Sequence, residues 1–242
     1  MVSETTPPRL PTWAEWLDQL WDDIHGLVHS LLIFRGWNEI VATADPQTAT
    51  PGNFHQWVNH NYVAYLAVTI RRLTDTRRDT VSLVRLLDDV ARHTSDISRS
   101  WFVSRAIPQD RRLAEEQFDQ LSTADGTHMD RRIPRGDRER LMTDCDKIKS
   151  YVDTQIAHLG REQLPEEGPT FEDAHSASAS IYALYRKWYE ILKERSLAPM
   201  LPEPWQQIFT VPWLSPDQAS AIADRVRTTW ISETQLPGLR LE

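Results

Sequence analysis

DRERLMTDCDKIKSYVDTQIAHLG, residues 137–160, carries the clearest helical pattern in this chain of 242 residues. Its apolar residues recur at steps of three and four, which gathers them on one face of a helix: Leu141, Cys145, Ile148, Val152, Ile156 and Leu159. Asp137 can cap the start of this helix, and Gly160 can end it. The pattern therefore predicts a helix over 137–159 that buries one side.

Tyr151, Thr154 and His158 follow one another at helical spacing along the flank of this apolar face. A histidine in that place can meet a groove between helices, where an imidazole can transfer protons near neutral pH. A histidine at a helix end can equally complete the hydrogen bonds of the last carbonyl groups. His158 is therefore a candidate site residue that also has a structural interpretation.

The same periodicity predicts helices on both sides of this stretch. The expected ranges are 12–44, 54–75, a helix beginning at Thr80 or Ser82, 95–105, 111–121, 137–159, 170–195 and 215–231. Several of them open with two residues at the spacing of a capping box: Thr12 with Glu15, Asn53 with Gln56, and Thr170 with Asp173. Ser215, Pro216 and Gln218 open the last helix, with proline at its preferred first position. No segment alternates as a strand would. The fold class is therefore all-α, an antiparallel helical bundle with short connections.

Composition divides the chain into three parts. Residues 1–11 are polar and hold three prolines, so they form a flexible arm; residues 12–196 form the bundle; residues 197–242 form a proline-rich wrap and a last helix. Apolar residues cover much of the circumference of the helix at 54–75, which predicts a central position. We expect the aromatic and apolar residues of the wrap to be buried across the bundle: Trp205, Ile208, Phe209 and Trp213.

Charge and cysteine content limit the classes of function. The net charge is -8, which opposes a broad electrostatic grip on nucleic acid, so any such contact must be local. The single cysteine, Cys145, lies on an apolar helix face and is interpreted as a buried structural thiol. No apolar run is long enough to span a membrane, and residues 1–11 lack a basic segment followed by an apolar one, so neither secretion nor membrane insertion is expected. The cytoplasm is the expected location.

Common catalytic motifs are absent from the sequence. It holds no GxGxxG, GxxxxGK[ST], GxSxG or HExxH and no paired cysteines, so no cofactor is predicted. One metal alternative remains: Asp22, His25 and His29 are spaced by three and four residues and would share one helix face. A further ligand would have to come from another helix. Histidines that face a partner helix are more often hydrogen-bonded structural residues.

Two groups of arginines are candidates for holding a phosphate. In IRRLTDTRRD, residues 70–79, Arg71 and Arg72 end an apolar helix, where basic side chains complement the helix dipole. If either turned into a cavity, its guanidinium could hold a phosphate by two parallel hydrogen bonds. A second group is expected to be solvated in and after a loop: Arg131, Arg132, Arg135, Arg138 and Arg140.

Parts of the chain resemble the HEPN superfamily, in its abortive-infection-like branch. The resemblance rests on YVDTQIAH at 151–158, on PTFEDAHSASASIYALYRKWYEIL after the loop, and on IRRLTD followed by DTVSLVRLL. Together these segments cover roughly residues 12–195. The resemblance implies a helical bundle that often dimerises and that, in its active members, is a metal-independent endoribonuclease.

The ribonucleases of that superfamily carry an arginine four to six residues before the histidine, often followed directly by asparagine. Only His158 matches this pattern, because Asp153 and Thr154 stand at the other two positions. An arginine would balance charge on the phosphate while the histidine transfers protons, whereas an aspartate repels the phosphate. If the chain is a ribonuclease, another helix must supply the cation.

Three interpretations follow. The first is a HEPN-like interaction or regulatory module of bacterial defence or stress response, working as a homodimer without its own catalysis. The second is a toxin-like ribonuclease that uses His158 with Arg71 or Arg72, and Tyr151 beside them. The third is a metal protein built on Asp22, His25 and His29. The partner is accordingly a second copy of the chain, another protein or RNA.

Overall fold

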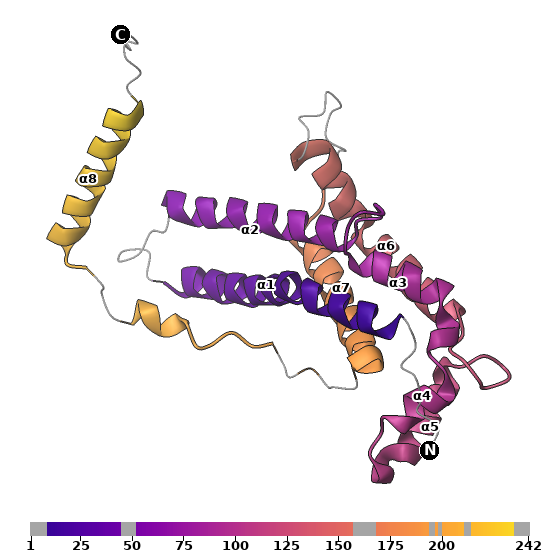
Figure 1. Ribbon diagram of the computed structural model, residues 1–242. Coiled ribbons are helices and arrows are strands. Elements are labelled where there is room, and N and C mark those ends of the chain that lie inside the picture. Colours follow the sequence, from indigo (N-terminus) through magenta and orange to yellow (C-terminus); the bar gives the residue numbers. More distant parts are fainter. Residues whose placement is uncertain are drawn as a thin grey trace. The chain divides into compact units, whose positions relative to one another are not determined.

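The computed structural model describes residues 9–44, 52–156, 168–193, 197, 200–210 and 214–234. The chain divides into two compact units, Met1–Leu201 and Pro202–Glu242. Figure 1 shows that the described part is built from helices. Two isolated bridges, Ser98 with His128 and Ser122 with Met129, are the only β pairing among the described residues. The predicted all-α fold is confirmed.

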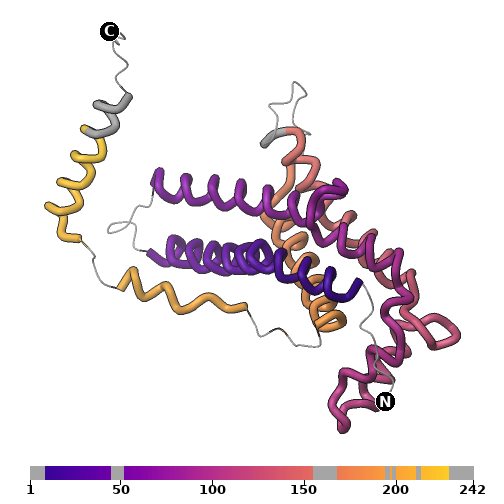
Figure 2. The backbone as a smooth tube through the Cα atoms, viewed as in Figure 1, coloured from indigo at the N-terminus to yellow at the C-terminus, as the bar shows by residue number. Residues whose placement is uncertain are grey.

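The first unit is organised by two long helical pairs. Helix α1 (Leu10–Thr43) and helix α2 (Gly52–Leu73) run antiparallel, side by side (Figures 1 and 2). Helix α6 (Arg132–Tyr151) and helix α7 (Phe171–Lys193) form the second pair, and α7 also packs on α1. Helix α3 (Leu83–Arg92) packs along α6. These contacts give the antiparallel bundle that the sequence predicts.

Two shorter helices, α4 (Arg99–Ser104) and α5 (Arg111–Leu121), pack on each other beside this bundle. The helix expected over 95–105 is shorter than predicted, because α4 covers only Arg99–Ser104 and Thr94–Asp96 form a separate 3-10 turn. Helix α4 begins only after Ser98, whose hydroxyl accepts a hydrogen bond from the Trp101 amide at 3.2 Å. A serine cap of this kind fixes the start of a helix.

Asp137 is not the cap that the sequence suggests. Helix α6 begins five residues earlier, at Arg132, and Pro134 fits in its first turns, where the missing amide costs nothing. Asp137 is instead buried inside the bundle. Its carboxylate accepts hydrogen bonds from the Lys187 ammonium at 2.6 Å and the Trp188 indole at 3.0 Å. It therefore ties α6 to α7, while Gly160 lies outside the described residues.

The other predicted caps divide into two groups. Thr170 and Asp173 exchange reciprocal side-chain and backbone hydrogen bonds, so this capping box is confirmed. Ser215 and Gln218 make the same pair of bonds at the start of the last helix. The pairs near the first two helices are wrong. Helix α1 begins two residues before Thr12 without any side-chain cap, and Asn53 lies inside α2, which begins at Gly52.

One hydrophobic core holds the helices of the first unit together. Its largest side chains come from α1, α2, α3, α5 and α7 and are fully buried: Trp13, Leu17, Ile24, Leu27, Ile70, Leu86, Phe118, Tyr185 and Trp188. Cys145 also lies in this core, and burial raises the pKa of its thiol to about 12. A thiol with that pKa stays protonated and unreactive at neutral pH, in agreement with a structural role.

Helix α2 is not the central helix that its apolar circumference suggests. One side is buried, with Tyr62, Leu66 and Ile70 in the core. The other side leaves large apolar side chains exposed, among them Phe54 (57%) and Trp57 (60%). No helix in the described ranges is long and apolar enough to cross a membrane. The exposed apolar side of α2 is therefore a surface of the bundle.

The second unit holds a 3-10 turn, Gln206–Phe209, and helix α8 (Pro216–Thr234). Trp205 and Phe209 pack edge to face, with ring centroids 6.1 Å apart. Within this unit Ile208 and Phe209 are exposed, and their expected burial across the bundle stays a prediction. Trp213 lies outside the described residues. Figure 2 follows the backbone of this part of the chain.

Candidate functional site

The C-terminal end of α2 meets the segment that follows α6. Arg71 lies in the last turn of α2, and α6 continues into a π-helical turn, Val152–Ile156, which carries Asp153. These two segments pack together although they are far apart in the sequence. Single π turns within α-helices are frequently found at functional sites. This junction places an arginine beside Asp153, within the segment 151–158 that resembles a HEPN domain.

Arg71 and Asp153 form an ion pair at this junction. The Arg71 Nε donates to Asp153 Oδ1 at 2.7 Å, and the Arg71 Nη1 lies 3.7 Å from Asp75 Oδ1. The side chains of Arg71 and Asp153 are 28% and 47% exposed, so water reaches both partners. Asp75 is less exposed; desolvation alone would raise its pKa, but the hydrogen bonds from Arg77 together with the charges of Arg77 and Arg71 lower the pKa overall. Arg71 therefore faces two carboxylates.

Arg72, the other arginine considered for the site, is turned elsewhere. Its Nη2 lies 3.1 Å from Asp23 Oδ2 on α1, and its side chain is 66% exposed. An exposed ion pair of this kind stabilises a protein by at most about 1 kcal/mol. The structure therefore brings Arg71, and not Arg72, to the junction with Asp153.

Tyr151 lies beside an apolar cavity between α2, α6 and α7. The cavity has a volume of about 760 Å³ and is lined by Tyr62, Val63, Leu66, Ala67, Ile148, Tyr151, Gly168, Pro169, Thr170, Phe171 and Ala174. Tyr62 shares a 2.8 Å hydrogen bond with His175 Nε2, and burial raises the pKa of the Tyr62 hydroxyl. Burial also lowers the pKa of His175. Both side chains are therefore neutral at physiological pH.

His158 lies outside the described residues, so the structure gives no distance between His158 and Arg71. The described part of the junction offers the guanidinium of Arg71 and the carboxylates of Asp153 and Asp75, while Tyr151 lines the cavity between α2, α6 and α7. A guanidinium can hold a phosphate, but here a carboxylate already occupies its Nε. Arg71 and Asp153 are separated by 82 positions, so no sequence motif could have revealed their pairing.

The histidines of α1 do not form a metal site in the described part of the chain. The rings of His25 and His29 lie 3.8 Å apart, centroid to centroid. Burial and the neighbouring His25 lower the pKa of His29. Among the described residues, no three His, Cys, Asp or Glu side chains are placed to hold a metal ion. The alternative built on Asp22, His25 and His29 therefore gains no support.

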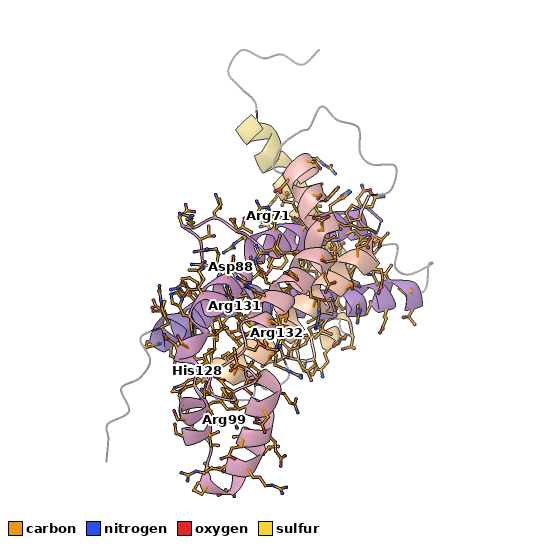
Figure 3. All side chains as sticks on the ribbon, turned by 90° about the vertical axis from the view of Figure 1, so that its right-hand side faces the viewer. Arg71, Asp88, Arg99, His128, Arg131 and Arg132 are labelled. Atoms are coloured by element: carbon orange, nitrogen blue, oxygen red, sulfur yellow. The ribbon has the colours of Figure 1, made fainter. Side chains whose placement is uncertain are left out.

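The second arginine group is spread along the start of α6. Arg132 pairs with Asp130, and Arg138 pairs with Asp88 on α3 at 2.8 Å. Arg131 and Arg135 are exposed and make no ion pair with the described residues. Figure 3 shows Arg131 and Arg132 on the same side of the molecule as Arg71. Arg131, Arg132, Arg135 and Arg140 are exposed, as expected, whereas Arg138 is half-buried against α3.

The comparison with protein families gives a match over most of the chain. Residues 10–202 match the family model HEPN_AbiU2, described as AbiU2. The search of curated proteins and the search of solved structures found no match. The matched range includes α1 to α7 and therefore both sides of the Arg71–Asp153 junction.

Proposed function

Because the chain belongs to the AbiU2 family of HEPN domains, we propose that it is an interaction or regulatory module of bacterial defence or stress response without catalysis of its own. The observation that carries the proposal is the Arg71–Asp153 pair at 2.7 Å. Asp153 stands at the position where the HEPN ribonucleases that this chain resembles have an arginine. A carboxylate at that position puts a negative charge where the ribonucleases have a positive one, so a phosphate would be repelled there.

The electrostatics at this junction disfavour phosphoryl chemistry. Stabilising charge in a transition state requires donors that are already oriented toward the reacting oxygens. A phosphate approaching Arg71 would have to displace Asp153 from the guanidinium Nε and would be repelled by the carboxylate. Asp75 adds a second negative charge, since its Oδ1 lies 3.7 Å from Arg71 Nη1. The junction is therefore better suited to holding α2 against α6 than to cleaving RNA.

One specific observation favours the second candidate, a metal-independent ribonuclease. Arg71 comes from another helix and reaches the position at which the motif itself lacks an arginine. If a substrate phosphate replaced Asp153 as its partner, Arg71 would supply the missing cation and His158 would transfer the proton. RNA would then be the partner, and Tyr151 would line the same region.

Incubating the full chain with total RNA in EDTA distinguishes the non-catalytic module from the ribonuclease. We expect the wild type to leave the RNA intact, because Asp153 neutralises Arg71. The His158→Ala, Arg71→Gln and Arg72→Gln variants are tested beside it, and circular dichroism checks that each is folded. Arg72 is a matched control, since it adjoins Arg71 in sequence but pairs with Asp23 on α1.

Cleavage by the wild type that disappears in His158→Ala and Arg71→Gln, and persists in Arg72→Gln, would establish the ribonuclease and refute the module. Loss in all three variants would point to general electrostatic binding of RNA. Intact RNA with every protein supports the module.

We also propose that the module is a homodimer, through a surface that includes part of α6 and α7. Phe171, at the start of α7, is 47% exposed and stacks on Phe34 and Tyr62. Large aromatic side chains are enriched at protein interfaces. Sedimentation at micromolar concentration is expected to show about twice 28.1 kDa.

Phe171→Arg is expected to return the homodimer to the monomer. Leu113→Arg is the control, because Leu113 is similarly exposed (54%) on α5, outside this pair. A species of 28.1 kDa alone in the wild type would contradict self-association.

A further inference from the structure

The solvent-facing side of α2 carries a stripe of five exposed residues. They follow one another at steps of three and four residues, which places them on one side of the helix: Phe54, Trp57, Asn61, Tyr65 and Val68. Residues 52–70 contain no Asp, Glu, Lys or Arg, although these types make up 26% of the chain. We name these five residues the α2 stripe.

Contacts with α1, which lies along α2 (Figure 1), hold both ends of the stripe in place. At one end Phe54 meets Trp37 of α1 edge to face, with ring centroids 5.7 Å apart, and stacks on Trp57 at 5.9 Å. Toward the other end the Tyr65 hydroxyl lies against Gly26 of α1, where a Cβ would collide with it. The aromatic side chains of the stripe therefore have fixed positions on the surface.

The composition of the stripe is that of a protein interface. Interface cores are depleted of charged residues and enriched in Trp, Tyr and Phe. Burying an unpaired charge costs free energy. This side of α2 presents no carboxylate, ammonium or guanidinium group before Arg72, which is itself paired with Asp23 of α1. Large apolar side chains that are exposed together mark interaction sites, so the stripe fits an uncharged, apolar partner surface.

The order of residues in the stripe is symmetric about Asn61. Trp57 and Tyr65 lie four positions on either side of it. Phe54 and Val68 lie seven positions on either side. A two-fold axis at this point places Trp57 of one copy against Tyr65 of another, and the apolar ends of the two stripes against each other. In such an isologous contact each pair occurs twice, so the stripe is complementary to itself.

We propose that the α2 stripe binds the α2 stripe of a second copy, with the two helices antiparallel. Residues at steps of three and four form the ridges that pack between helices. The Asn61 Nδ2 donates to the Trp57 carbonyl at 2.8 Å, and the Asn61 Oδ1 makes no hydrogen bond with the described residues. At the axis this oxygen accepts from the amide of its counterpart, which provides the hydrogen bond that a buried polar atom needs.

This contact goes beyond the proposed homodimer, because it uses α2 and not the surface of α6 and α7. The two surfaces together join homodimers into tetramers. The stripe spans about 21 Å from residue 54 to residue 68, at 1.5 Å per residue. A single helix pair of that length is small for an interface, so the association is weak and becomes populated above micromolar concentration.

Disulfide cross-linking tests the axis. Asn61→Cys places a thiol beside its counterpart, so mild oxidation is expected to give a covalent dimer on a non-reducing gel. Phe54→Cys is the matched control on the same stripe, because antiparallel packing separates the two copies of residue 54 by about 21 Å along the helices. The native Cys145 is buried and does not react. Equal cross-linking of the two variants, or none in Asn61→Cys, would refute the antiparallel contact.

Complementary substitutions test the register of the contact. Trp57→Lys and Tyr65→Glu are each made in the Phe171→Arg background, which removes the α6–α7 contact, and sedimentation is followed above micromolar concentration. Each substitution alone is expected to weaken association at least about tenfold, the loss typical of a central aromatic residue. An equimolar mixture is expected to restore association, because the introduced lysine of one copy meets the introduced glutamate of the other. Leu113→Lys is the control, since Leu113 is 54% exposed on α5.

The mixture decides whether the two stripes pair as proposed. Association of the mixture that is no stronger than that of each variant alone would overturn the proposal. An equal loss of association in Leu113→Lys and Trp57→Lys would overturn it as well. Circular dichroism checks that every variant is folded. Because Phe171→Arg is present throughout, a failure of the proposed homodimer leaves this result unchanged.

Discussion

Replacing Trp13 by alanine is expected to lower the free energy of unfolding by about 3–5 kcal/mol. Trp13 is fully buried on α1, and its indole Nε1 donates a 2.8 Å hydrogen bond to Asp89 on α3. The substitution removes a large side chain from the core and leaves a cavity. It also removes a donor from a carboxylate that is itself only 6% exposed. Chemical denaturation followed by circular dichroism measures the change.

Two variants divide this effect into its parts. Trp13→Phe keeps an aromatic ring in the core but loses the hydrogen bond, so it should cost about 1–3 kcal/mol. Trp57→Ala is the surface control, because Trp57 is 60% exposed on α2, and its cost should remain below about 1 kcal/mol. If Trp13→Ala cost no more than Trp57→Ala, the packing of α1 on α3 would be refuted.

The helices that the sequence predicts well depend on local spacing. Thr170 and Asp173 are three residues apart, so their reciprocal hydrogen bonds form within a single turn. Ser82 likewise caps α3 by accepting from the Arg85 amide at 3.1 Å. Interactions of this kind need no knowledge of the rest of the chain. The apolar stripe over 137–159 also predicts a helix because its period is local.

The errors come from interactions between distant segments. Asp137 has the residue type and place of a cap, but its partners Lys187 and Trp188 lie 50 and 51 positions later. The apolar circumference of α2 shows that either side could be buried, but not which side the neighbouring helices cover. Packing against α6 and α7 decides that question.

The candidate sites show the same limit. Arg71 and Asp153 are each recognisable as candidates, but their pairing requires α2 and the end of α6 to meet in space. The cavity lined by Arg99 and His128, between α4, α5 and the loop before α6, has no motif at all. Its residues come from three segments between Ser98 and His128, and the position of Arg99 depends on the conformation of Gly126. Only the folded chain brings these residues together.

Replacing Asp137 by alanine is expected to lower the free energy of unfolding by about 2–4 kcal/mol. The carboxylate is 6% exposed and accepts from both Lys187 and Trp188. Without it, the buried Trp188 indole loses its acceptor. Lys187 is 37% exposed and can turn to water, so the cost should stay below that of a fully buried unpaired charge. Denaturant titration followed by circular dichroism measures it.

Asp146→Ala is the matched control for this prediction, because Asp146 is an exposed aspartate on the same helix. Its cost should remain within about 0.5 kcal/mol. The double variant Asp137→Ala with Trp188→Phe removes the donor together with the acceptor, so its cost should be smaller than the sum of the two single costs. Strict additivity, or equal costs for Asp137→Ala and Asp146→Ala, would show that this carboxylate does not tie α6 to α7. The measured coupling therefore tests the hydrogen bond between Asp137 on α6 and Trp188 on α7.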